Sequence, residues 1–239
     1  MGTIKDYRNM VEQPWGRMFY DLIYRQLTIP SGKRAMILDF GAGFCITADH
    51  YAKDHDVTAL EPNEEMYDLR IKNSDYMLIP EGIEYLQGIE DKSFDVIICH
   101  NVLEYVDDIE TLVKHFVRGL KPGGILSIVK HNELGKVFAY SVLNDNPKAA
   151  LDVLDKCIED SAFGNRNVYS NEYLAKLLVD EAELKEIYGI RTFFGLSSNN
   201  DIKFNEEWYR DMLELETRAG AIDEYKKVAF YNHLIFKKK

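Results

Sequence analysis

The residues best suited to binding a ligand lie in one glycine-containing turn between an apolar run and a helical pattern. Asp39 ends the apolar run, and Gly41 and Gly43 follow it, two residues apart. Because glycine lacks Cβ, the backbone here can approach a ligand closely and adopt positive φ. A dinucleotide fingerprint requires a third glycine at position 46, where this chain has Ile46. The pattern therefore favours a nucleoside ligand without a diphosphate, with S-adenosylmethionine the leading candidate.

Further residues that could bind the same ligand follow other predicted strands. Glu61 ends the second strand, where an acid can accept hydrogen bonds from both ribose hydroxyls; the alternative is a solvated acid before the turn at Pro62. The segment 87–91 follows the third predicted strand and could reach the adenine amino group. His100 follows the fourth and could line the pocket, although a lone histidine is more often an interior residue.

The elements that must position these residues alternate as in a βαβ sheet. The insertions at about 134–169 and 195–221 do not fit this alternation and are candidates for acceptor-binding elements at the carboxyl edge of the strands. The first thirty residues predict one amphipathic helix, with Met18, Phe19, Leu22, Ile23 and Leu27 on one face. The predicted strands are 35–40, 56–60, 83–87, 94–99, 124–129, 184–194 and 227–236, and the other predicted helices are 44–53, 63–72, 108–120 (stopped by Lys121 to Gly124) and 170–180.

Composition bounds the class of protein. A chain of 239 residues, 46% hydrophobic, can bury a full core as one α/β domain over 1–239. The net charge of −11 argues against a protein that binds nucleic acid through its whole surface. We expect no signal peptide, no membrane span and no metal site, since the six histidines are dispersed. Three distant cysteines, Cys45, Cys99 and Cys157, suit reduced thiols in the cytoplasm.

Several motifs together resemble the class I S-adenosylmethionine-dependent methyltransferases: DFGAG, LEPN, QGIED, FDVIICHNVLEYVDD and LKPGGILSIV, in that order and spacing. The resemblance implies a Rossmann-like, seven-stranded α/β sheet with an antiparallel last strand and helices on both faces. It implies S-adenosylmethionine as cofactor and S-adenosylhomocysteine as product. It also implies these cofactor-binding residues: Arg17, Asp39, Gly41, Ala42, Gly43, Glu61, Pro62, Gly88, Ile89, Glu90, Asp91 and His100.

A narrower resemblance covers nearly the whole chain. HNVLEYV, KPGGILSIV, the segment Gly189 to Phe194 and especially LELETR, Leu213 to Arg218, look like the tRNA 5-carboxymethoxyuridine methyltransferases. This implies tRNA as partner and the carboxylate of a modified wobble uridine as methyl acceptor. The alternative is a small acidic metabolite, which the acidic charge favours. A nicotinamide-dependent dehydrogenase is disfavoured by Ile46 and by the absence of a Tyr-x-x-x-Lys pair.

The acceptor side offers two arginines and no unmistakable base. A carboxylate is already ionised near neutral pH and needs no general base, whereas an amine or phenol would need one. Arg191 and Arg218 lie in the segments shared with the carboxylate-methylating family, so we expect them to hold an anionic acceptor. The alternatives are an outward strand residue for Arg191 and an ion pair with Glu214 for Arg218. Other acceptor-side candidates, each also explicable by packing, are Tyr20, His131 and Asn132.

Overall fold

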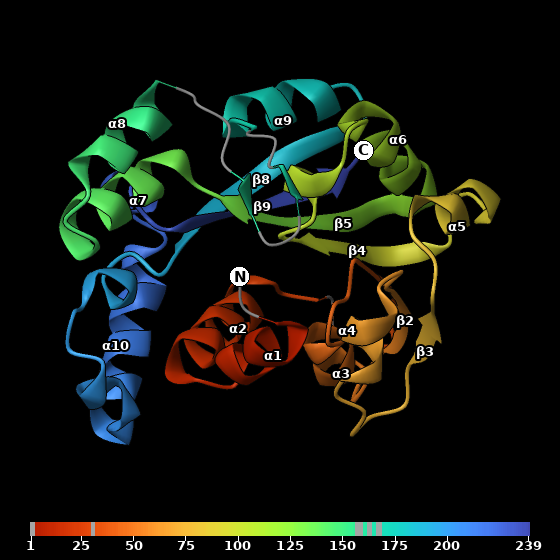
Figure 1. Ribbon diagram of the computed structural model, residues 1–239. Helices are drawn as coiled ribbons and strands as arrows, with labels where there is room; N and C mark the ends of the chain where they lie inside the picture. The colour runs from red at the N-terminus through yellow and green to blue at the C-terminus, as the bar shows by residue number, and fades with distance from the viewer. Residues whose placement is uncertain (1–2, 30–31, 156–159, 162–163, 166–168) are drawn as a thin grey trace. The chain divides into compact units, whose positions relative to one another are not determined.

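A computed structural model describes residues 3–29, 32–155, 160–161, 164–165 and 169–239 (Figure 1). The chain divides into two compact units, each described separately below. The prediction that 1–239 form a single domain stays a prediction. Unit 1 comprises Met1–Thr28, Val129–Val168 and Ile187–His233, and unit 2 comprises Ile29–Ile128, Tyr169–Glu186 and Leu234–Lys239.

The central element is a seven-stranded sheet in the order β3-β2-β1-β4-β5-β9-β8. Strand β1 pairs in parallel with β2 and β4, β2 pairs in parallel with β3, and the last strand, β9, is antiparallel. This confirms the predicted fold class. The strands are β1 Met36–Phe40, β2 Asp56–Leu60, β3 Met77–Ile79, β4 Phe94–His100, β5 Leu120–His131, β8 Ala182–Ile190 and β9 Tyr231–Lys238; β6 Asp160–Ser161 and β7 Gly164–Asn165 form a separate pair.

The helices alternate with the strands along the chain, in the order that the colours of Figure 1 follow. Side-chain caps begin several of them: Asn63 is the N-cap of α4 and Ser170 is the N-cap of α9. In unit 2 the helices are α3 Ile46–Tyr51, α4 Glu64–Asp68, α5 Ile83–Gly88, η1 Leu103–Tyr105, α6 Ile109–Gly119 and α9 Asn171–Leu178. In unit 1 they are α1 Ile4–Val11, α2 Pro14–Gln26, α7 Glu133–Phe138, η2 Ala139–Leu143, α8 Pro147–Leu154, η3 Phe194–Leu196, η4 Asp201–Phe204, α10 Glu206–Ala219 and α11 Asp223–Lys226.

The N-terminal segment is two helices where the sequence predicted one. Helix α1 ends at Val11, and Gln13 is extended, with ψ of 165°. Pro14 explains the break, since proline restricts the preceding residue to extended conformations and is itself favoured at the first position of a helix. The predicted apolar face is nonetheless confirmed, because Met18, Phe19, Leu22 and Ile23 are core residues of unit 1.

The third strand lies earlier in the chain than predicted. Residues 83–87 were predicted as a strand and form helix α5, whereas the strand is the three-residue β3, Met77–Ile79. In α5 the apolar residues Ile83 and Leu86 are three apart, which is also the spacing of one helix face. A five-residue run cannot separate the two periods, and β3 is too short to give a pattern of its own.

Two other predicted boundaries shift for identifiable reasons. The segment Lys121 to Gly124 belongs to β5 and does not stop the preceding helix, which ends at Gly119. A Cβ on Gly124 would lie 3.1 Å from the carbonyl oxygen of Asp95, so glycine lets β5 start close to β4. Strand β8 ends at Ile190, short of the predicted 194, because the next residue has a left-handed φ of 62°.

That early end of β8 depends on one buried carboxylate. Glu216, in α10, has no exposed surface. Its Oε2 accepts a hydrogen bond from the backbone N–H of Thr192 at 2.8 Å, and its Oε1 accepts from Phe193 at 2.7 Å and Phe194 at 2.6 Å. Three N–H groups that a longer strand would leave for pairing are thus satisfied by a side chain from LELETR. Two of the motifs that carry the narrower resemblance, Gly189 to Phe194 and LELETR, are therefore partners in one turn of unit 1.

Further findings concern the expected absences. Among the described residues, no helix is long and apolar enough to cross a membrane. Over the same part of the chain, no group of three His, Cys, Asp or Glu side chains could hold a metal ion. Cys45 and Cys99 are buried free thiols, and Cys157 lies outside the described residues.

The Glu216 turn gives a first prediction. In Glu216→Gln the amide NH2 replaces one acceptor oxygen, so one buried backbone N–H loses its partner. We expect a loss of roughly 2–4 kcal/mol in the free energy of unfolding, measured by urea denaturation. The matched control is Glu207→Gln, an exposed glutamate of the same helix, with a change below about 0.5 kcal/mol. Equal effects of the two substitutions would show that Glu216 does not hold the turn.

Candidate active site

The glycine turn after β1 adopts the backbone that only glycine accommodates easily. Gly41 has a φ of 72° and Gly43 a φ of 55°, both left-handed. A Cβ on Gly41 would lie 2.4 Å from Cγ2 of Val102, two residues beyond the end of β4. The turn therefore packs against the segment that follows β4, at the carboxyl edge of the parallel strands, which is where open α/β sheets bind ligands.

The backbone amides of this turn are already engaged. The N–H groups of Gly41 and Ala42 both donate to the carbonyl oxygen of Leu60 at 2.9 Å. The N–H of Gly43 donates to Oε2 of Glu61 at 2.7 Å. A diphosphate-binding loop needs such N–H groups free to point at the ligand. The geometry therefore agrees with the missing glycine at Ile46 and disfavours a dinucleotide.

Glu61 is a buried carboxylate and not the solvated acid of the alternative interpretation. Its exposed fraction is 6%, and Oε1 accepts a hydrogen bond from the N–H of Asn63 at 2.8 Å. Burial raises the pKa of Glu61, while its two backbone hydrogen bonds lower it. A carboxylate offers about four acceptor positions, and these bonds use two. The two remaining positions leave room for the hydrogen bonds from the ribose hydroxyls, which stay a prediction.

Asp39 brings a second buried acid to the same turn. It is 3% exposed, and its Oδ2 is buried with no hydrogen-bond partner among the described residues. Burial, and next the charge of Glu61, raise the pKa of Asp39 to about 7. An unsatisfied buried carboxyl oxygen is costly, so it marks a place where a ligand that donates hydrogen bonds or carries positive charge would bind favourably.

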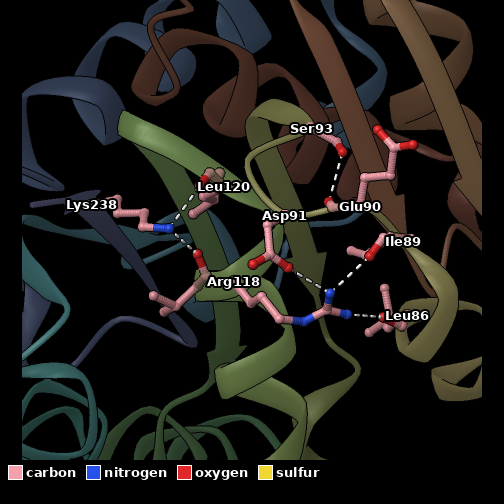
Figure 2. Close-up of polar contacts among 9 residues, drawn as sticks. Leu86, Ile89, Glu90, Asp91, Ser93, Arg118, Leu120 and Lys238 are labelled. Atoms are coloured by element: carbon pink, nitrogen blue, oxygen red, sulfur yellow. Dashed lines mark hydrogen bonds and ion pairs between the residues drawn. The ribbon is translucent and has the colours of Figure 1, made fainter.

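Gly88, Ile89, Glu90 and Asp91 lie away from this turn. Their expected place after the third strand is wrong, because they follow helix α5. Figure 2 shows the guanidinium of Arg118 donating to the carbonyl oxygens of Leu86 and Ile89 and to Oδ1 of Asp91, at 2.6, 2.8 and 2.8 Å. The segment leads through Lys92 and Ser93 into the start of β4, whereas the glycine turn follows the last residue of β1. Since β1 and β4 are parallel, the two segments lie at opposite edges of the sheet.

The corner after β3 occupies the place that the sequence assigned to 88–91. Pro80, Glu81 and Gly82 connect β3 to α5 at the carboxyl edge. A Cβ on Gly82 would lie 3.8 Å from Cγ of Pro62, so this corner adjoins the end of β2. A glycine before a helical segment was the available signal. The sequence does not reveal this corner, because the pattern of α5 resembles that of a strand and so hides the short β3 before it.

The end of β4 holds a half-buried histidine and an unsatisfied amide. Nε2 of His100 lies 2.8 Å from Oγ of Ser127 on β5, and its role in lining the cofactor pocket stays a prediction. The next residue, Asn101, has a left-handed φ of 56°, and its Oδ1 is buried with no partner in the described part of the chain. Asn101 is a candidate ligand-contacting residue that sequence reasoning missed, since a single asparagine carries no pattern.

Arg17, in unit 1, is engaged by acidic side chains. Its guanidinium makes a bidentate pair with Glu206, at 2.7 and 3.1 Å, and its Cζ lies 4.1 Å from the ring centroid of Tyr209. Asp21 is a further neighbour, at 3.7 Å. A role in binding the methionine carboxylate would require Arg17 to leave Glu206, and it stays a prediction.

Three of the acceptor-side candidates have packing partners in unit 1. The ring of Tyr20 contacts Phe19, with centroids 5.3 Å apart, and the ring of His131 contacts Tyr231 at 4.7 Å. The amide nitrogen of Asn132 donates to the carbonyl oxygens of Lys227 and Ala229 at 2.8 and 2.7 Å. Asn132 therefore fixes the chain before β9.

The two arginines of the shared segments differ. Arg218 pairs with Glu214 at 2.8 Å and is 75% exposed, which is the helix-surface alternative. Arg191 is half-buried, and its Nε is buried with no hydrogen-bond partner among the described residues. Its Cζ lies 5.8 Å from the ring centroid of Phe194 and 5.6 Å from that of Phe230. Arg191 alone keeps the features of an anion-binding arginine.

The comparisons with known proteins agree with the geometry of the turn. Residues 38–128 match the family described as a methyltransferase domain, and this range contains the glycine turn, Glu61 and His100. This chain is an S-adenosylmethionine-dependent methyltransferase. The cofactor of the methyltransferase is S-adenosylmethionine, whose sulfonium nucleoside fits a turn with buried acids and no free phosphate-binding amides.

Relatives extend the likeness beyond the matched domain. The ubiquinone biosynthesis O-methyltransferase of Rickettsia typhi is 27% identical over 187 residues, 74% of this chain and 72% of the relative. That of Rickettsia prowazekii is 25% identical over 206 residues, 82% and 79% of the two chains. Among solved structures, an S-adenosylmethionine-dependent methyltransferase of Thermotoga maritima has a TM-score of 0.64 at 16% identity, covering 99% of this chain and 96% of that one. The plantazolicin methyltransferase, in complex with S-adenosylhomocysteine, has a TM-score of 0.58 at 17% identity, covering 99% and 89%. These two structures show the fold.

A glycine pair tests which segment contacts the cofactor. Gly41→Ala adds a Cβ that collides with Val102 at a left-handed φ, so we expect the affinity for S-adenosylhomocysteine in calorimetry to fall about tenfold or more. The control is Gly88→Ala, whose Cβ would meet no atom within 4 Å and which we expect to leave the affinity unchanged. A comparable loss of affinity in Gly88→Ala would show that the segment 88–91 does contact the cofactor.

The raised pKa of Asp39 predicts a dependence of stability on pH. An acid whose pKa is higher in the folded state stabilises the fold at low pH, and this contribution is lost as the pH rises from about 4 to about 7. Asparagine does not titrate. We therefore expect the stability of Asp39→Asn relative to the unsubstituted chain to grow by roughly 2–3 kcal/mol between pH 5 and pH 8 in urea unfolding. The same substitution should weaken cofactor binding. A stability difference that is flat with pH would contradict the raised pKa.

Proposed function

We propose that this methyltransferase transfers the methyl group to a carboxylate, that of a modified tRNA wobble uridine. The proposal depends on Arg191. This residue is half-buried, and its buried Nε has no hydrogen-bond partner among the described residues. Guanidinium geometry matches a carboxylate. Arg191 lies in a segment that resembles the carboxylate-methylating tRNA enzymes.

The chemistry places modest demands on the protein. Bound S-adenosylmethionine supplies a methyl group whose carbon a carboxylate oxygen attacks in line. The O–C bond forms as the C–S bond breaks, the electron pair of the C–S bond stays on the departing sulfur, and no proton is transferred. The chain then has to bind the acceptor, orient it and exclude water. Neither His131 nor Tyr20 needs to act as a base, which agrees with their packing against Tyr231 and Phe19. The cofactor is assigned to Asp39, the turn Gly41 to Gly43, Glu61 with Pro62, and the corner 80–82.

A small acidic metabolite is the alternative acceptor. The net charge of −11 disfavours a tRNA held over the whole surface, because phosphate contacts dominate such binding. A tRNA acceptor would have to be bound through a local basic patch. A cytoplasmic location suits both acceptors and the free thiols of Cys45 and Cys99.

A phenolic acceptor is favoured by a different observation. The relatives that match 74% and 82% of this chain are named for O-methylation in ubiquinone biosynthesis. A phenol needs a general base near its hydroxyl, and an ether is formed in place of an ester. The chemical stability of the product therefore separates the two proposals.

The test uses S-adenosylmethionine labelled in the methyl group and the purified full chain. Acceptors are bulk tRNA and a small-molecule extract, both from the source organism with the gene deleted, and a simple catechol. We expect label in tRNA that mild alkali releases as methanol, because esters hydrolyse and aryl ethers do not. Gly41→Ala, assayed at a cofactor concentration below its raised Kd, is the matched low-activity control. Alkali-stable label on the catechol, with none on tRNA, would replace the carboxylate proposal with the phenolic one.

A further inference from the structure

The ring of Phe194 in unit 1 lies against two cationic side chains. The Nζ of Lys203, from η4, is 4.9 Å from the ring centroid, and the Cζ of Arg191 is 5.8 Å from it. Both distances lie within the range of cation–π contact. Two cations on one aromatic ring repel each other, so such an arrangement calls for a compensating negative charge.

Lys203 is one of two buried lysines in the described part of the chain, the other being Lys130. Lys203 is 6% exposed, and its ammonium donates to the carbonyl oxygen of Ser197 at 2.8 Å and to Oδ1 of Asn200 at 2.9 Å. Both partners are neutral, whereas buried lysines are normally paired with a carboxylate. An ammonium has three N–H groups, so one remains for a further acceptor. Burial, and next the charge of Arg191, lower the pKa of Lys203.

The neighbouring carboxylate does not neutralise this pair. Glu216 has both oxygens occupied by the backbone N–H groups of Thr192, Phe193 and Phe194. With Glu216 ionised, the two cations still leave one excess positive charge in a half-buried cluster. The hydroxyl of Thr192 is also unsatisfied, since its buried Oγ1 has no hydrogen-bond partner among the described residues.

We propose that Lys203 and Arg191 together bind the carboxylate of the acceptor, with Lys203 as a specificity residue. This rests on the proposed function and adds a second cation to it. The carboxylate would take the unused N–H of Lys203 and the Nε of Arg191, and it would compensate the excess charge. Methylation turns this anion into a neutral ester, so the clamp binds the substrate more tightly than the product.

The proposal is tested without turnover by titrating the full chain with acetate, and separately with inorganic phosphate, at constant ionic strength. Trp208 provides the fluorescence signal, since its ring lies 6.0 Å from that of Phe194. We expect saturable acetate binding, tighter than that of phosphate. In Lys203→Met this affinity should fall about tenfold or more, and Lys203→Arg should recover most of it. The control is Lys148→Met, an exposed lysine of α8 in the same unit, which should bind as the unsubstituted chain does.

Three outcomes would overturn the proposal: no saturable binding of acetate, tighter binding of phosphate than of acetate, or an unchanged affinity in Lys203→Met. Circular dichroism checks that the variant is folded. If Lys203→Met is not folded, the comparison of Lys203→Arg with Arg191→Met decides, because acetate binding must be kept in the first and lost in the second. In the labelled-methyl assay, Lys203→Met should raise KM about tenfold with little change in kcat. The acetate titration needs neither cofactor nor methyl transfer, so failure of the clamp is distinguishable from failure of the carboxylate proposal.

Discussion

The hydrogen bonds that join the ends of β1 and β2 are the constraint on which the cofactor site depends. The carbonyl oxygen of Leu60 and the carboxylate of Glu61 together take the N–H groups of Gly41, Ala42 and Gly43. These bonds fix the turn and remove the amides that would otherwise bind phosphate. Buried acids in place of open N–H groups give the site its preference for a sulfonium nucleoside over a dinucleotide.

A buried carboxylate also accepts hydrogen bonds from backbone N–H groups in unit 1, where the result is the end of a strand. Glu216 takes three consecutive backbone N–H groups and ends β8. Because Glu216 turns the chain there, Arg191 has a left-handed φ, and its Nε has no hydrogen-bond partner among the described residues. Within LELETR, Glu216 satisfies backbone N–H groups, while Arg218 lies on the surface with Glu214. A charged residue of a motif can thus serve the backbone, and a part for this motif in recognising the acceptor stays a proposal.

The likeness to known proteins is unevenly distributed along the chain. The family match ends at residue 128, within β5 and at the end of the largest segment of unit 2. Most of unit 1, with Arg191 and Lys203, lies outside it. This agrees with the common pattern in which a fold conserves its cofactor chemistry and varies its acceptor. The acceptor proposal therefore rests on a few side chains of unit 1.

The sequence by itself predicted the sheet except for β3, the glycine turn, the acid Glu61 and the cofactor, because these depend on local patterns: a buried apolar run, glycines where φ is positive, and an acid at a strand end. It did not determine the corner 80–82, because the three-residue β3 is too short for a periodic signal and α5 imitates a strand. Only the tertiary structure shows the surroundings of Arg191, Lys203 and Glu216, from which the acceptor proposals are argued. Those proposals depend on the electrostatic interactions of Arg191 with Lys203 and with Glu216, and residues 191, 203 and 216 come together only when the chain folds.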